Sequence, residues 1–143
     1  MADASEVTRA HDDAWNTKDV EGRKACSAPD MELEMPGGMQ LKGVDQVRQV
    51  EGVFWEALPD SQIKQTKEFV AGDTVIVEGF LTGTHTGVFR TPQGEIPASG
   101  NPVSLRYASV KRVAGGKIIS EHLYFDQMEF MTQIGALPPM GSA

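Results

Sequence analysis

The sequence predicts an α+β fold, in which a curved antiparallel sheet wraps around helices packed on one of its faces and forms a cone open at one end. Two observations support this fold class. Apolar residues recur at three- and four-residue spacings in the N-terminal part of the chain and alternate with polar residues from residue 62 onward. The segments follow in the order of helices, a short hairpin, a further helix and a four-stranded meander. An open cone of this kind is a natural pocket for a small molecule.

The first predicted helix begins with a capping box, because Asp3 is followed three residues later by Glu6. The sequence NTKD at 16–19 interrupts this helix, and a second short helix runs to about Cys26. One stripe of the first helix is apolar apart from a histidine, and it comprises Val7, Ala10, His11, Ala14 and Trp15.

A short hairpin and a longer helix are predicted next. The segment APDMELEMP at 28–36 alternates as a strand, with one face formed by Met31, Leu33 and Met35. Two glycines at 37–38 make a turn to a short return strand at 39–43. The period then becomes that of an amphipathic helix, which Pro59 ends and whose apolar positions are Val44, Val47, Val50, Phe54, Ala57 and Leu58.

The C-terminal half predicts the meander. Its strands are expected at 62–70, 74–85, 103–113 and 118–125. The segment AGGK at 114–117 joins the last two, and a closing helix at 127–134 is stopped by Gly135. The chain contains no internal repeat, so we expect a single domain at 1–137 followed by a tail at 138–143.

Composition and charge exclude several classes of protein. The chain has 143 residues, and its 13 Lys and Arg against 20 Asp and Glu give a formal charge of -7. The basic residues form no cluster, so nucleic acid is not an expected partner. The single cysteine, Cys26, cannot form an intrachain disulfide. A signal peptide and a membrane-spanning run are both absent, which predicts a cytoplasmic protein with no membrane partner.

The sequence contains no recognisable motif for a cofactor or a metal. The three histidines, His11, His85 and His122, include no local pair with metal-ligand spacing. Phosphate-binding, dinucleotide-binding and G-x-S-x-G patterns are absent as well. We therefore expect chemistry that uses neither a cofactor nor a metal.

The last two strands can be aligned residue by residue. If the two glycines of AGGK form a two-residue turn, the strands pair in a fixed register, with His122 opposite Ser109 and Tyr124 opposite Tyr107. The pocket face would then carry Tyr107, Ser109, His122, Tyr124 and Asp126. The opposite face would carry Leu123 and Phe125, and a slip of one residue would exchange the two faces.

Asp126 is the strongest candidate for chemistry, because a carboxylate at a strand end inside an apolar pocket can act as a general base or acid. Asp126 and Glu129 also have the form of a capping box for the closing helix, and spacing alone leaves both roles open. His122 either polarises a carbonyl or is a half-buried strand histidine. His85, in the sequence GTHTG, suits a backbone passing close to a ligand and equally suits a strand that ends in a loop.

Six segments between Trp15 and Gly135 have the order and spacing typical of one family: APDMELEMPGG, EALPD, LTGTHTGVF, GEIPASGNPVSLR, GGKIISEHLYFD and MTQIGAL. They resemble the SnoaL-like polyketide cyclase (ester cyclase) family of the nuclear transport factor 2 superfamily. This resemblance implies the α+β cone and an intramolecular aldol condensation of a nogalonic-acid-type methyl ester, without metal or cofactor. It also implies an acid/base role for Asp126 and a place near the pocket for His85. Two residues depart from the family pattern and leave the substrate open: Asn101 and Glu129.

We therefore expect an enzyme that removes a proton next to a carbonyl of a small apolar or aromatic substrate, with Asp126 as base and His122 or His85 holding the enolate oxygen. Substrate-binding residues are expected to be Trp15, Met35, Phe54, Tyr107 and Tyr124. The alternatives are an epoxide hydrolase with Glu78 as a distant second acid, a ketone isomerase, a non-catalytic binding module and a structural homo-oligomer. The apolar outer face of the sheet predicts a homodimer or a higher homo-oligomer.

Overall fold

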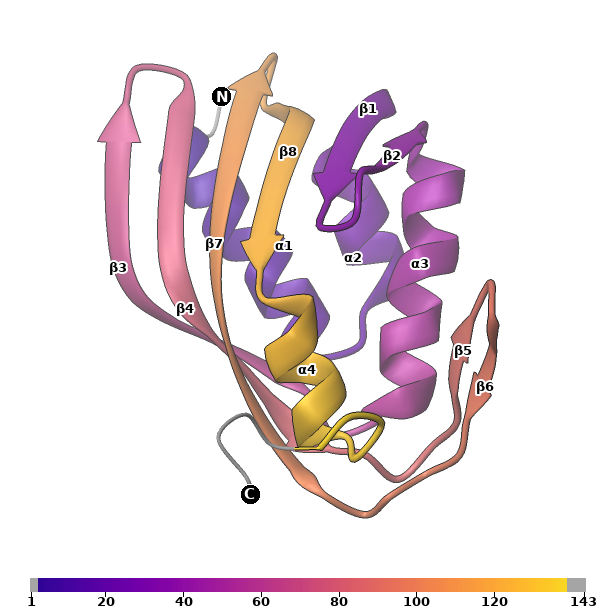
Figure 1. Cartoon of the computed structure of the whole chain (residues 1–143). Helices are drawn as coiled ribbons and strands as arrows, with labels where there is room; N and C mark the ends of the chain where they lie inside the picture. Colours follow the sequence, from indigo (N-terminus) through magenta and orange to yellow (C-terminus); the bar gives the residue numbers. More distant parts are fainter. Residues whose placement is uncertain (1–2, 139–143) are drawn as a thin grey trace.

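The computed structural model describes residues 3–138 and has the expected α+β cone architecture (Figure 1). Its first elements are helices α1 (Ala4–Asn16) and α2 (Val20–Ala25), strands β1 (Ser27–Met35) and β2 (Met39–Lys42), and helix α3 (Val44–Ala57). The remaining elements are β3 (Gln62–Ala71), β4 (Thr74–Thr84), β5 (Phe89–Thr91), β6 (Gly94–Ile96), β7 (Pro102–Ala114), β8 (Lys117–Phe125) and α4 (Gln127–Gln133).

Side-chain caps begin three of the four helices. The Asp3 carboxylate accepts a hydrogen bond from the Glu6 N–H at 2.8 Å and starts α1, as the capping box predicts. Asp19 accepts from the Gly22 N–H at 2.9 Å and starts α2. Asp126 caps α4 in the same way. These caps stabilise helix N-termini whose first N–H groups would otherwise lack partners.

The main sheet has the strand order β2-β1-β8-β7-β4-β3. Neighbouring strands are antiparallel, as expected, except β1 and β8, which run parallel. The last strand of the meander β3-β4-β7-β8 lies beside the N-terminal hairpin, and β8 and β1 run in the same direction there (Figure 1).

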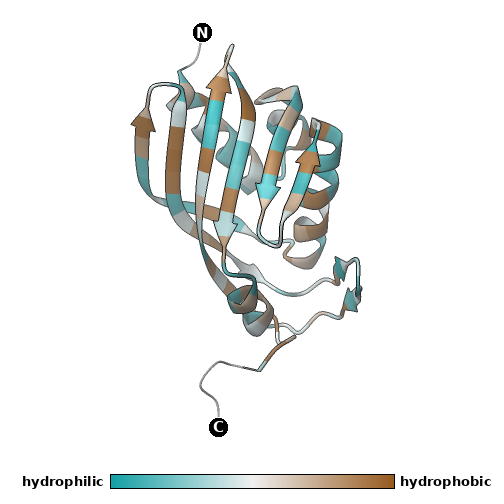
Figure 2. Ribbon diagram, turned by 45° about the horizontal axis from the view of Figure 1, so that its top comes forward, coloured by the Kyte–Doolittle hydropathy of each residue, from teal (hydrophilic) through white to brown (hydrophobic). Residues whose placement is uncertain are grey.

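Helices α1, α2 and α3 cover the inner face of the sheet, while no helix of residues 3–138 covers most of its outer face (Figure 1). Hydrophilic and hydrophobic bands alternate along β7 and β8, as two-faced strands require (Figure 2). Two buried clusters form the core. One contains Val7, Met31, Leu33, Val44, Val47, Val113 and Ile118. The other lies toward α4 and contains Ala57, Leu58, Val103, Leu105, Phe130 and Ile134.

A small hairpin made of β5 and β6 lies between β4 and β7 in the chain and was not anticipated from the sequence. It forms a separate two-stranded sheet beside the C-terminal end of α3 (Figure 1). Arg90 donates hydrogen bonds to Glu56 of α3, with an Nε–Oε1 distance of 2.9 Å. The Phe89 ring packs against Phe54 with centroids 5.5 Å apart. The hairpin is thereby held close to the open end of the cone.

Within residues 3–138, no helix has the length and apolar character needed to cross a membrane. The predicted C-terminal tail, residues 138–143, lies outside the described residues apart from Pro138.

Candidate functional site

The cone encloses an inner cavity of about 110 Å³ between the inner face of the sheet and the three N-terminal helices. Its walls are mainly apolar, and four of the five expected substrate-binding residues line it: Trp15, Met35, Phe54 and Tyr107. At the end of the cavity away from α4, the lining becomes polar. The polar lining residues are Asp12, Arg23, Glu51, Tyr107, Ser109, Lys111 and Glu121.

Two buried ion pairs form most of this polar end. Arg23 of α2 contacts Glu51 of α3 with an Nη2–Oε2 distance of 2.5 Å, and their side chains are only 8% and 10% exposed. Lys111 of β7 contacts Asp12 of α1 with an Nζ–Oδ1 distance of 3.1 Å. Burial raises the pKa of the Glu51 carboxyl, and the positive charge of Arg23 offsets only part of this rise. These pairs connect all three N-terminal helices to each other or to the sheet.

Glu121 differs from the other two cavity carboxylates. It lies on β8 and is buried, and its Oε2 accepts a hydrogen bond of 2.8 Å from the Ser109 hydroxyl. Within residues 3–138 this is its only side-chain hydrogen bond, and it forms no ion pair, whereas Asp12 and Glu51 are each paired with a cation. A carboxylate held by one donor in this way retains acceptor capacity that faces the cavity.

Tyr107 provides the complementary group, a hydroxyl that can donate. The phenol oxygen is buried, and no partner for it exists among the described residues. Burial raises the pKa of Tyr107, and the negative charges of Asp12 and Glu121 raise it further, so the phenol stays protonated. Gly79 leaves room for it, because a Cβ at this position would lie 3.0 Å from the phenol oxygen and 2.3 Å from the Lys64 carbonyl oxygen. Leaving a buried hydroxyl without a partner is costly, which makes it a candidate for contacting a ligand.

The register predicted for β7 and β8 is wrong by one residue over most of its length. The two-residue turn is present, since Ala114 pairs with Lys117, but Ile119 is an extra residue in β8 that forms a bulge. Beyond it, Ser109 pairs with Leu123 and Tyr107 with Phe125. The inward face of β8 therefore carries Glu121, Leu123 and Phe125.

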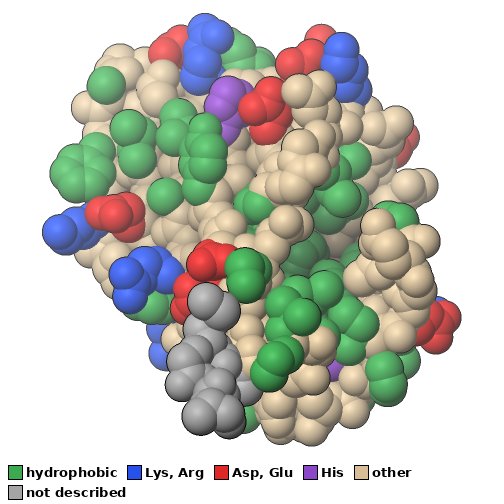
Figure 3. All heavy atoms as spheres, viewed as in Figure 1, with side chains coloured by type: hydrophobic (Ala, Val, Ile, Leu, Met, Phe, Trp, Pro, Cys, Tyr) green, Lys and Arg blue, Asp and Glu red, His purple; other side chains and the backbone are tan. Residues whose placement is uncertain are grey.

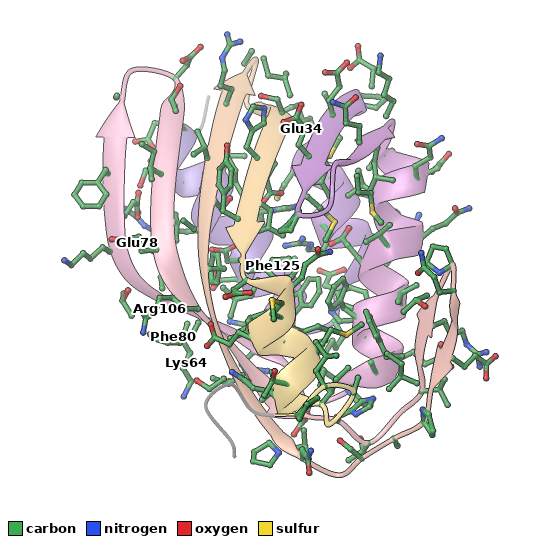
Figure 4. The ribbon with its side chains drawn as sticks, in the orientation of Figure 1. Glu34, Lys64, Glu78, Phe80, Arg106 and Phe125 are labelled. Carbon is green, nitrogen blue, oxygen red and sulfur yellow. The ribbon has the colours of Figure 1, made fainter. Side chains whose placement is uncertain are left out.

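His122 and Tyr124 consequently lie on the outer face of the sheet, and their expected position in the pocket is wrong. Tyr124 is 56% exposed. The His122 Nε2 lies 3.9 Å from a carboxylate oxygen of Glu34, another exposed residue of the outer face (Figure 4). Phe125 points from the end of β8 toward the helices instead (Figure 4).

Asp126 is an exposed helix cap. Its Oδ1 accepts hydrogen bonds from the N–H groups of Met128 at 2.9 Å and Glu129 at 3.2 Å, which confirms the capping alternative. It is not part of the lining of the inner cavity, because the strand ends one residue earlier with Phe125 pointing inward. Its role as a base stays a prediction without support from this position.

His85 is buried but also lies outside the cavity lining. The Ser99 N–H donates to its Nδ1 at 3.2 Å, and the backbone of His85 exchanges hydrogen bonds with Gly100 and Asn101. It therefore ties the two ends of the segment that carries the β5–β6 hairpin. Of the two readings of GTHTG, this geometry favours the structural one.

Stability should fall in mild acid because of His85 and His11. Burial lowers the pKa of both below the ordinary value of 6.5, and for His11 the charges of Arg23 and Lys111 lower it further. The unfolded chain then binds protons below pH 6.5 that the folded chain does not, so the stabilisation is present above this pH and is lost as the pH falls. We expect a loss of about 0.8 kcal/mol for His11 between pH 7.5 and 6, the most that an unfolded pKa of 6.5 allows, and a smaller loss for His85.

Urea unfolding at pH 7.5, 6.5 and 6 measures this loss. The pH dependence should fall by at least half in His11→Asn, whatever the stability of that variant at pH 7.5. A free energy of unfolding that stays constant from pH 7.5 to 6 would contradict the assignment.

Sequence analysis missed most of the polar end of the cavity. Asp12, Arg23, Glu51 and Lys111 come from four different elements and have no common spacing. Glu121 shares the face of Leu123 and Phe125, which the expected register turned away from the pocket, although one signal could have found it. Leu123 and Phe125 alternate with it, and the apolar residues of a one-sided sheet normally face the core.

No group of three or more His, Cys, Asp and Glu side chains within residues 3–138 is arranged to hold a metal ion. What the described arrangement offers is an apolar cavity with one unpaired carboxylate and one unpartnered hydroxyl at its inner end. Such a site can bind a small molecule by its apolar part and exchange a proton with it.

The α+β cone with its internal apolar cavity has the nuclear transport factor 2-like fold. Residues 5–134 match the SnoaL-like polyketide cyclase family, and the chain belongs to this family. The resemblance noted in the sequence is thereby confirmed. A search of the curated proteins found no match.

Solved structures share the fold at low sequence identity. A protein of Jannaschia sp. CCS1, provisionally described as a SnoaL-like polyketide cyclase, has a TM-score of 0.82 and 24% identity, covering 95% of this chain and 93% of its own. AclR from Streptomyces galilaeus, provisionally described as a hydroxylase, has a TM-score of 0.81 and 23% identity, covering 96% of this chain and 83% of its own. IdmH from Streptomyces antibioticus, provisionally described as a polyketide cyclase, has a TM-score of 0.80 and 21% identity, covering 94% of this chain and 99% of its own.

At these identities the structures show a common fold and leave the reaction open, as the different descriptions of AclR and IdmH illustrate. Family membership supports an enzymatic role of the cyclase or isomerase type.

Proposed function

We propose that the protein is a cofactor-independent enzyme that removes a proton from a carbon next to a carbonyl group, on a small apolar or aromatic substrate, and promotes an intramolecular aldol reaction. The observation that carries this proposal is Glu121, a buried cavity carboxylate that forms no ion pair within residues 3–138, since its cross-strand neighbour Lys111 is paired with Asp12. The family and the apolar walls of the cavity support the same reaction class.

The proposed first step uses two side chains. Glu121 takes the proton from the carbon, and the electrons of the C–H bond move to the carbonyl oxygen to give an enolate. The Tyr107 hydroxyl donates a hydrogen bond to this oxygen as its negative charge develops. Apolar walls exclude water and strengthen both interactions.

In the second step the enolate carbon attacks another carbonyl group of the same molecule and forms a carbon–carbon bond. The new alkoxide takes back the proton held by Glu121, so the step needs no other reactant. Ser109 positions the base by its hydrogen bond to Oε2. The buried pairs Arg23–Glu51 and Asp12–Lys111 hold the surrounding helices and strand in place.

Deuterium uptake by NMR tests the proposal. Methyl esters of aroylacetic acids, which carry an exchangeable C–H between two carbonyls, would be followed in deuterated buffer with and without protein. We expect Glu121→Gln to slow the protein-dependent exchange by about 10²–10⁴-fold, since it removes the base. Tyr107→Phe should slow it by about 10²-fold, since it removes a single donor to the oxyanion.

Asp126→Asn is the matched control, because asparagine also caps a helix. Exchange should be unchanged in this variant, with melting curves to confirm that all three variants fold. Loss of exchange in Asp126→Asn together with retained exchange in Glu121→Gln would overturn the proposal and make Asp126 the base.

The same experiment separates the alternatives. A ketone isomerase would share the first step and return the proton to a different carbon, which the position of deuterium reveals. A binding module would bind the ester equally well with and without Glu121→Gln and exchange nothing. Epoxide hydrolysis has less support, because Arg23 pairs with Glu51 alone among the acids of residues 3–138. Glu78, considered as a second acid, is exposed on the outer face (Figure 4).

A homodimer remains the proposed assembly. Within the described part of the chain, no helix covers the outer face of the sheet over β3, β4 and β7, and apolar side chains are exposed across these strands (Figure 3). Phe69 and Tyr124 are more than half exposed. On the same face the Arg106 guanidinium lies 5.8 Å from the Phe80 ring (Figure 4). A second copy could cover this surface, and sedimentation velocity measures whether it does.

A further inference from the structure

Lys111 is a buried ammonium group with hydrogen-bond donors to spare. The residue is 3% exposed and lines the inner cavity. An ammonium carries three N–H donors, and within residues 3–138 it has one acceptor, the Asp12 Oδ1 at 3.1 Å. Glu121 is its cross-strand neighbour but forms no ion pair with it. Buried donors without a partner cost free energy, so two N–H groups of Lys111 are available to a group in the cavity.

The carboxylate of Asp12 fixes this ammonium beside the cavity. Its Oδ1 accepts from Lys111, while its Oδ2 accepts from the Gln65 side chain at 3.4 Å. Tyr107 lies near the same carboxylate, because the charge of Asp12, after burial, is the next largest cause that raises the pKa of this phenol. The Tyr107 hydroxyl and the Lys111 ammonium are therefore two donors held around Asp12 at the polar end of the cavity.

The inner face of β7 arranges the two donors on either side of the proposed base. Tyr107, Ser109 and Lys111 alternate along this strand, so their side chains share one face, and all three line the cavity. Ser109, in the middle, donates its hydrogen bond to Glu121. The base is thus held from the centre of a row that has a donor residue at each end.

Arg23, the other cation of the cavity lining, is already committed to protein acceptors. Its Nε donates to Glu51 at 2.6 Å, and its Nη1 donates to the His11 carbonyl at 2.7 Å. These bonds fix the guanidinium from both sides. Of the two cavity cations, Lys111 is the one whose donors remain mostly unused.

An intramolecular aldol reaction needs two such donors, because two carbonyl oxygens become negative in turn. The first is the enolate oxygen, for which the proposed function provides Tyr107. The second is the oxygen of the carbonyl that is attacked, and it gains its charge as the carbon–carbon bond forms. Donors fixed in advance around such an oxygen accelerate the step, since they need no reorganisation.

We infer that Lys111 is a further catalytic residue, which donates hydrogen bonds to the attacked carbonyl oxygen during ring closure. As the enolate carbon bonds to the carbonyl carbon, the π electrons of this C=O bond move to its oxygen, beside the ammonium. The proton held by Glu121 then passes to that oxygen, and Lys111 keeps its own protons. The inference rests on the proposed function for the reaction, and it assigns the residue that serves the second carbonyl.

Binding of a stable anion tests the inference without any reaction. The probe is 4-nitrophenol at pH 8.5, where the free compound is an anion, and 4-nitroanisole is its neutral counterpart. Glu121→Gln serves as the background, because glutamine stands for the protonated base that is present when the oxyanion forms. Quenching of tryptophan fluorescence gives Kd for both probes, since Trp15 lines the cavity.

Adding Asp12→Asn/Lys111→Met to this background removes one charge of each sign, so the net charge of the cavity stays the same. We expect the anion to bind about 10–100-fold more weakly, because it loses hydrogen bonds from a charged donor. Binding of 4-nitroanisole should be unchanged, which also shows that the cavity is intact. Unchanged binding of the anion, or an equal loss for both probes, would overturn the inference.

Asp73→Asn/Arg112→Met is the matched control. Arg112 follows Lys111 on β7, and its pair with Asp73 is exposed on both sides, at 56% and 53%. Removing this pair also leaves the net charge unchanged, and the Kd of both probes should stay as in the background. A loss of anion binding equal to that of the cavity variant would mean that any ion pair of β7 has the same effect.

A single substrate separates this inference from the proposed function. Methyl 3,7-dioxooctanoate exchanges deuterium at C2 in the first step, and in the second C2 attacks the C7 ketone to close a six-membered ring. In Asp12→Asn/Lys111→Met we expect ring closure to slow by about 10²–10³-fold, while exchange at C2 slows by no more than about threefold. A merely structural role of Lys111 would lower both rates equally.

The two ideas therefore fail differently. Exchange and ring closure that fall together would remove the catalytic role of Lys111 and leave the proposed function standing. Lys111-dependent binding of the anion, with no protein-dependent exchange by the wild type, would remove the proposed reaction and leave Lys111 as an oxyanion-binding group of the cavity.

Discussion

Replacing Arg23 by methionine is expected to lower the free energy of unfolding by about 3–5 kcal/mol. The substitution leaves Glu51 buried without its cation, and the desolvation that already raises the pKa of this carboxyl then acts without compensation. The guanidinium also lies 5.1 Å from the Trp15 ring and donates to the His11 carbonyl, and both contacts are lost. Urea unfolding at pH 7.5 measures the change.

A double-mutant cycle shows whether the loss comes from the unpaired carboxylate. In Arg23→Met/Glu51→Leu both charges are gone, and we expect most of the lost stability to return. The control is Arg90→Met, which breaks an exposed pair with Glu56 and should change stability little. Additive effects of the two cavity substitutions would mean that Arg23 and Glu51 are not coupled.

Gly87→Ala is expected to destabilise the protein by about 2–3 kcal/mol. A Cβ on Gly87 would lie 1.8 Å from the Glu56 carbonyl oxygen and 2.9 Å from its carbon, so the backbone itself would have to move. Gly87 also donates a hydrogen bond to the Ala57 carbonyl at the end of α3. The close approach sets where the chain leaves β4 for the β5–β6 hairpin.

The same substitution at Gly52 should have the opposite sign. Gly52 lies in the interior of α3, and a Cβ there would meet nothing within 4 Å. Alanine is favoured over glycine in a helix, so we expect a gain of about 0.5–1 kcal/mol. The change in the free energy of unfolding, measured in urea, should therefore differ in sign between the two variants, and a gain in both would show that the contact at Gly87 relaxes without cost.

The sequence by itself determined the elements of the fold. Helical spacing predicted α1 and α3, alternation predicted the long strands, and the family motifs predicted the cone. Local hydrogen-bonding patterns were also reliable. The caps at Asp3 and Asp126 and the two-residue turn between Ala114 and Lys117 all occur, because each depends on residues a few positions apart.

Only the tertiary structure decided which residues meet in the cavity. The bulge at Ile119 sends His122 and Tyr124 outward and Glu121 inward, and a single extra residue leaves little trace in an alternating sequence. Asp12 and Lys111 form their ion pair 99 residues apart, and Arg23 meets Glu51 across two helices. Such pairs form where packing brings two charges together and burial removes the water that would otherwise solvate each of them. Their members therefore cannot be recognised before the packing of the elements is known. The site is therefore a property of the packed cone, while its elements are a property of the local sequence.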